Sequence, residues 1–148
     1  MDKKRSEMAS EYFEKGYNCA QSVLYAFKDV FNLNEDLVQG LGGGLGGGLG
    51  KMGLTCGAVM GAFILIGLKY GKRDRNDNQA KEKTYEKVRH FNQLFKEKNG
   101  SIVCNDLLGY DITKQEDMAV IKEKGLFKTV CTQAIIDALD ILEKNIMT

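Results

Sequence analysis

A chain of 148 residues is long enough to bury a substantial core, and its length indicates one domain over residues 1–148. Its 21 basic and 20 acidic residues leave a net charge of +1, so no excess of basic charge points to nucleic acid as a partner. The absence of proline, with long stretches of periodic apolar residues, favours an all-α fold.

The amino-terminal half begins with two predicted helices. Residues 6–15 have the pattern of a short helix that ends at Gly16, and this segment lacks the apolar centre of a signal peptide. Asn18 is a suitable cap for a second helix that begins at Cys19 and carries an apolar stripe. We therefore expect a cytoplasmic protein, in which thiols are kept reduced.

Residues 32–36 are expected to form a break before a tract of glycine interrupted only by Leu41, Leu45 and Leu49. Glycine costs about 1 kcal/mol relative to alanine inside a helix, so we expect an ordered loop with its leucines in the core. The tract satisfies G-x-G-x-x-G trivially and no strand precedes it. A nucleotide site is therefore not expected.

The most apolar stretch, residues 52–68, contains no charged residue. It is borderline for a membrane span, which needs roughly 20 residues, and it fits a buried central helix better. Thr55 is the expected N-cap, and Cys56 in the first turn would be favoured as a thiolate by the helix dipole. The residues expected to contact a cofactor there are Gly53, Thr55, Gly57, Ala58 and Gly61.

The second half of the chain predicts three further helices and one short one. A polar turn over residues 72–78 leads into a long helix over about 74–98, with Phe91 and Phe95 facing inward. Gly100 ends it, and a helix over 102–108 follows, with Cys104 in its first turn. Residues 111–124 are polar, with room for one short helix before Gly125. Thr129 is the expected cap of the last helix, placing Cys131 in its first turn. The result is a compact bundle of about five to six helices around the apolar one.

Cys19, Cys56, Cys104 and Cys131 are dispersed, without any C-x-x-C pair. Zinc ribbons, thioredoxin-type sites, common ferredoxin spacings and c-type haem attachment are thereby excluded, and a single histidine excludes a two-histidine metal site. Each cysteine is predicted to open a helix and to face inward. Converging helix starts would suit a thiolate-bound metal or iron–sulfur centre, and would equally suit reversible disulfides in any of three pairings.

The segment TCGAVMG, preceded by the glycine-rich GLGKMG, resembles the C_GCAxxG_C_C family of redox-active proteins. The resemblance extends from YNCAQSVL around Cys19 to VCTQAI around Cys131, and all four family cysteines have a counterpart. It implies a redox role, with a bound iron–sulfur or other metal centre, and all four cysteines as catalytic residues and metal ligands.

Three interpretations remain open at this stage. The first is an oxidoreductase or electron carrier that uses a cluster or exchanging dithiols, with Cys56 as the attacking thiolate and an unidentified redox partner. The second is a structural zinc module held by four cysteine ligands, and the third is a helical interaction protein with core cysteines. The small-residue helix face suits either a homodimer interface or the internal core, and membrane insertion is not expected.

Overall fold

The computed structural model describes residues 3–71 and 73–148, and it confirms the all-α fold. Lys72, the start of the predicted polar turn, lies outside the described residues, as do residues 1–2 of the predicted domain. The described part contains eight α-helices and a π-helical turn, rather than five to six helices. They are α1 (Arg5–Glu14), α2 (Cys19–Ala26), α3 (Glu35–Gly42), α4 (Gly57–Tyr70), α5 (Asn78–Asn99), α6 (Cys104–Leu108), α7 (Gln115–Lys124), α8 (Leu126–Ile141) and η1 (Leu142–Ile146).

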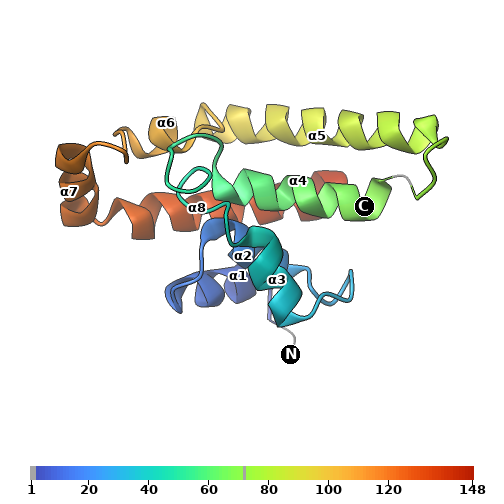
Figure 1. Ribbon diagram of the computed structural model, residues 1–148, viewed down its shortest axis with the longest axis horizontal. Coiled ribbons are helices and arrows are strands. Elements are labelled where there is room, and N and C mark those ends of the chain that lie inside the picture. Colours follow the sequence, from blue (N-terminus) through green and yellow to red (C-terminus); the bar gives the residue numbers. More distant parts are fainter. Residues whose placement is uncertain (1–2, 72) are drawn as a thin grey trace.

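Helices α4, α5 and α8 run side by side along the long axis of the molecule (Figure 1). Helices α1 to α3 cover one side, where α2 packs against α4 and α1 packs against α8. Helices α6 and α7 lie at one end, beside the start of α8. No helix among these residues combines the length and the apolar character that crossing a bilayer requires.

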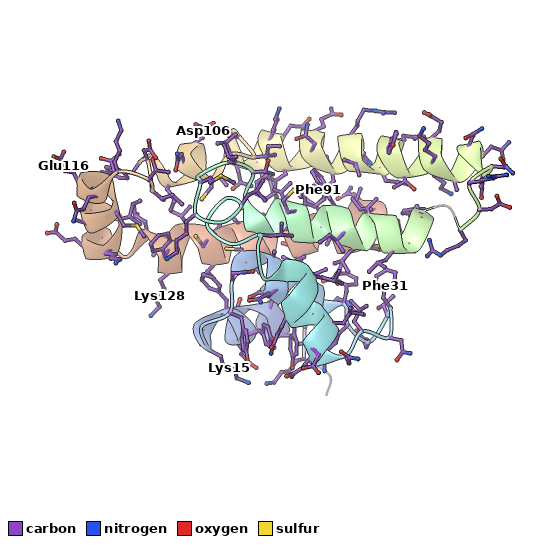
Figure 2. All side chains as sticks on the ribbon, viewed as in Figure 1. Lys15, Phe31, Phe91, Asp106, Glu116 and Lys128 are labelled. Carbon is purple, nitrogen blue, oxygen red and sulfur yellow. The ribbon has the colours of Figure 1, made fainter. Side chains whose placement is uncertain are left out.

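Burial of α4 is not uniform around its circumference. Its small and branched residues on one side are buried, whereas Met60, Phe63, Ile64 and Leu68 remain half-buried. The ring of Phe91 on α5 meets Phe63 edge to face at 5.8 Å between centroids, and Figure 2 shows Phe91 beside α4. The apolar helix is therefore packed by α2, α5 and α8 but is not enclosed on all sides.

The predicted break at residues 32–36 is found at residues 32–34 but is too long by two residues, because α3 begins at Glu35 and continues into the glycine tract as far as Gly42. The Asn34 side chain accepts a hydrogen bond from the backbone N–H of Leu37, and two acidic residues follow in the first turn. Both features stabilise a helix start, and they outweigh the cost of the first glycines.

The rest of the glycine tract and the residues up to Thr55 form an ordered loop, as predicted. We refer to residues 43–55 as the glycine-rich loop. Its backbone is closed on itself by bonds such as Gly53 N–H to Gly47 O at 3.1 Å and Leu54 N–H to Gly48 O at 2.9 Å. Its leucines are not held in the core, however. Leu41 is exposed, and Leu45 and Leu49 are half-buried. The glycine backbone, rather than the leucine side chains, makes the close contacts of this loop.

Candidate functional site

A single cavity of about 390 Å³ is lined by all four cysteines. It lies between the main core and a smaller apolar cluster built around Leu108, Ile112 and Ile121. Cys131 packs against both clusters. Sulfur atoms are visible in Figure 2 where the glycine-rich loop, α6 and α8 meet. Side chains from four distant parts of the chain thus meet in one place.

Backbone pairing places Cys56 close to Cys104. Thr55 and Val103 form an isolated antiparallel bridge, in which Cys56 N–H donates to Ile102 O at 2.7 Å. Cys104 N–H donates in return to Leu54 O at 2.6 Å. The prediction that Thr55 caps α4 is therefore wrong, since Cys56 itself is the N-cap residue and Thr55 is engaged in the bridge.

Cys19 is positioned by the capping of α2, as predicted. The Asn18 side chain accepts from Gln21 N–H and the Gln21 side chain accepts from Asn18 N–H, which completes a capping box. Asn18 also donates to Gly42 O at 2.9 Å, so the same residue anchors the start of the glycine-rich loop. A Cβ atom at Gly57 would lie 3.2 Å from the Cβ of Cys19, so glycine there allows the starts of α2 and α4 to approach closely.

The predicted placement of Cys131 is wrong in one respect. Helix α8 begins at Leu126, with Gly125 rather than Thr129 at its N-cap, so Cys131 lies in the second turn. The error arises because Gly125 takes a left-handed φ of 66°, which ends α7 and lets α8 begin at the next residue. Cys131 nevertheless lines the cavity, and it is half-buried where the other three cysteines are buried.

Gly48 makes the closest contact between the loop and a cysteine. Its φ is +69°, and a Cβ atom built there would lie 2.6 Å from the Cβ of Cys104. Real Cβ atoms do not approach one another so closely, so only glycine allows this packing. The loop backbone therefore forms part of the wall beside Cys104.

Burial raises the pKa of Cys56 to about 11 and that of Cys104 to about 12. The backbone N–H groups of Val59 and Ala58 act to lower the pKa of Cys56, but burial outweighs them. The expectation that the helix start makes Cys56 a thiolate is therefore wrong. A positive helix end cannot compensate for the loss of water around a thiolate in an apolar wall.

Cys19 and Cys131 form a hydrogen-bonded pair whose pKa values move apart. The bond to Cys131, together with burial, raises the pKa of Cys19 well above its ordinary value. The same bond from Cys19 lowers the pKa of Cys131. The two thiols therefore interact directly, and Cys131, the least buried of the four cysteines, is the one whose pKa is lowered.

Of the five residues expected to contact a cofactor, Gly57 is in the cavity wall. Gly53 lies against the side chain of Asn105, Thr55 is in the backbone bridge, and Gly61 packs against α2 next to Ala20. Ala58 is fully buried in the main core. Small size at these positions therefore serves the packing of α2, α4 and α6.

Lys51 and Lys122 also line the cavity, and the sequence offered little to identify them. Lys51 was recognisable only as the end of the uncharged stretch, and Lys122 is one of two lysines on α7. In the described residues no group of three or more His, Cys, Asp or Glu side chains is arranged to hold a metal ion. The cysteines share a wall without forming a ready ligand set.

The comparisons with known proteins agree with the cysteine pattern. Residues 17–145 match a family model described as "Putative redox-active protein (C_GCAxxG_C_C)". No curated protein and no solved structure matches the chain.

Proposed function

Because this chain belongs to the C_GCAxxG_C_C family of redox-active proteins, we propose that it is a dithiol oxidoreductase in which Cys131 and Cys19 cycle between thiols and a disulfide. The observation that carries this proposal is the direct interaction of the Cys19 and Cys131 thiols at the wall of the cavity. A neighbouring pair with divergent pKa values is what thiol–disulfide exchange requires.

Cys131 is the attacking thiolate in this proposal, in place of Cys56. Its pKa is lowered and its side chain is the least buried of the four, so it combines ionisation with access. The thiolate attacks one sulfur of a substrate disulfide, forms a mixed disulfide and releases the first substrate thiolate. Cys19 then loses its proton and attacks the sulfur of Cys131. The Cys19–Cys131 disulfide forms, the second substrate thiolate leaves, and two electrons pass from protein to substrate.

Cys56 and Cys104 stay protonated at neutral pH, since their pKa values are about 11 and about 12. A protonated thiol is a poor nucleophile, so these two cysteines remain reduced while the first pair exchanges. The cytoplasm, which keeps thiols reduced, is the compartment that fits this chemistry.

The test is stepwise oxidation of the reduced protein with a small disulfide, followed by thiol counting and peptide mapping by mass spectrometry. We expect two of the four thiols to be lost first and the Cys19–Cys131 linkage to be recovered. The Cys131→Ser variant should not be oxidised in this first step. The Cys104→Ser variant, the matched control, should still form the Cys19–Cys131 linkage. A first disulfide that joins Cys56 to Cys104 would contradict the proposal.

A four-thiolate metal or iron–sulfur centre is the second candidate, and the convergence of all four cysteines on one cavity favours it. The donor set fits in kind, because four thiolates suit zinc or an iron–sulfur cluster. The arrangement fits less well, because among residues 3–71 and 73–148 no three such side chains stand ready to hold a metal. The thiols would have to lose their protons and move together on binding.

Anaerobic purification with iron, sulfide and zinc analysis separates the two candidates. Stoichiometric iron and sulfide with visible absorption, lost equally in serine variants of all four cysteines, would favour the cluster. Stoichiometric zinc without colour would favour a structural zinc module. A metal-free protein with four titratable thiols would favour the dithiol.

A further inference from the structure

The cavity is larger than two exchanging thiols need. At about 390 Å³ it falls within the roughly 300–1,000 Å³ that small-molecule sites occupy. Much of its wall is apolar, with Phe13 from α1, Leu107 from α6, Met118 from α7 and Phe127 from α8. Such a wall suits the carbon skeleton of an organic molecule that lies next to the cysteines.

The charge on the cavity wall has one sign. Lys51 and Lys122 line it, and no acidic residue of the described chain does. Both lysines are exposed at the rim, and neither belongs to an ion pair in the described part of the protein. Two unneutralised ammonium groups at an apolar opening favour an anionic ligand over a neutral or cationic one.

The backbone of the loop is left-handed at Lys51. Lys51 takes a left-handed φ of 62° and Leu49 one of 67°, in a loop whose other residues of positive φ are glycines. Glycine adopts this conformation without steric cost, whereas a residue with a Cβ atom does not. Both non-glycine positions are therefore strained, and of the two Lys51 is the one that lines the cavity.

We propose that the cavity binds a small disulfide with an apolar middle and a carboxylate end, which Lys51 and Lys122 hold while Cys131 attacks. This substrate class rests on the proposed dithiol function. The carboxylate lies at the rim beside the ammonium groups, and the sulfur atoms lie inside beside Cys131. Exchange then follows the balanced two-step course already given, and the substrate leaves as two thiols.

The test compares two aliphatic disulfides, 3,3′-dithiodipropionate, which carries two carboxylates, and bis(2-hydroxyethyl) disulfide, which is neutral. Oxidation rates of the reduced protein are measured by mass spectrometry of acid-quenched samples, and each is divided by the rate for N-acetylcysteine amide, a thiol without a carboxylate, with the same disulfide. This division removes the intrinsic difference between the two leaving thiols. We expect a normalised preference for the dicarboxylate that weakens as salt is added.

Lysine variants identify the source of the preference. Loss of an exposed ion pair changes a rate or an affinity by roughly 1.4-fold to fivefold. Lys51→Gln and Lys122→Gln should therefore each reduce the preference by about that factor. Lys128→Gln, on α8 and outside the cavity wall, is the matched control and should leave it unchanged. Lys51→Gly should also lose the preference without a lower denaturation midpoint, since glycine suits the left-handed backbone. An equal normalised rate for both disulfides, or a preference that survives both lysine changes, would overturn the proposal.

Binding without reaction separates this inference from the proposed function. Isothermal titration of Cys131→Ser with 3,3′-dithiodipropionate should show binding that Lys51→Gln weakens, even though no exchange can start. If the wild-type pair never oxidises but this binding is found, the dithiol function fails and the anion site stands. If the pair oxidises but the dicarboxylate does not bind, the anion site is refuted and the dithiol function stands.

Discussion

Replacing Gly48 with alanine should destabilise the protein far more than the same change at Gly50, two positions along the loop. Both residues have a left-handed backbone, with φ of +69° and +60°. An L-residue in that conformation costs roughly 1–2 kcal/mol, partly offset by about 0.5–1 kcal/mol because alanine loses less backbone freedom than glycine on folding. The two substitutions share this term, so their difference reports packing alone.

Packing differs sharply between the two positions. The new Cβ at Gly48 would lie 2.6 Å from the Cβ of Cys104 and 2.6 Å from the backbone nitrogen of Leu54. At Gly50 the nearest atom, the carbonyl oxygen of Gly44, is 4.0 Å away. Overpacking costs typically about 1–3 kcal/mol, so Gly48→Ala should lose about that much more free energy of unfolding than Gly50→Ala.

Urea denaturation of both variants measures the difference, with unchanged m values as the sign that the unfolded states are comparable. A second readout is the alkylation rate of Cys104, which should rise in Gly48→Ala because relief of the clash displaces either the loop or that cysteine. Equal losses in the two variants, with no change in the alkylation of Cys104, would refute the view that the loop backbone forms the wall of the site.

Three further predictions concern the thiols and the helix packing. With iodoacetamide at pH 8, Cys131 should be alkylated before Cys56 and Cys104, whose pKa values are about 11 and about 12; mass spectrometry gives the order, and faster labelling of Cys56 would contradict it. Between about pH 9 and 12 the unfolded chain loses thiol protons that the folded protein retains, so stability should fall as pH rises. The denaturation midpoint should fall less when Cys56 and Cys104 are both replaced by serine. An identical fall in that variant would exclude these thiols as the cause. Gly61→Ala places a Cβ 2.9 Å from the Ala20 carbonyl oxygen and should lower the free energy of unfolding by about 1–3 kcal/mol. Gly67→Ala in the same helix meets nothing within 4 Å and should raise it by up to about 1 kcal/mol. Thermal melts that rank the two variants in the opposite order would contradict the packing of α2 on α4.

The local features of this fold could be predicted because their causes are local. The cap at Asn18, the helix ends at Gly100, Gly109 and Gly125, and the inward stripe of α5 were each predicted from a few neighbouring residues. Capping and left-handed helix ends depend on side-chain and backbone bonds within about one helical turn. The same reasoning failed at Glu35, where a cap and two carboxylates extended a helix into glycine.

The sequence by itself determined the all-α class, the family and the four cysteines that line the site, because helix periodicity and motif order are properties of the chain. Only the tertiary structure decided how the environments of the four thiols differ, since the pKa of a thiol depends on the water it loses and on the sulfur beside it. Burial raises the pKa of Cys56 at its helix start, whereas the pKa of Cys131 is lowered by its interaction with Cys19, 112 positions away in the sequence. That Lys51 from the loop and Lys122 from α7 line the same cavity was likewise set by the tertiary structure, which no local pattern encodes.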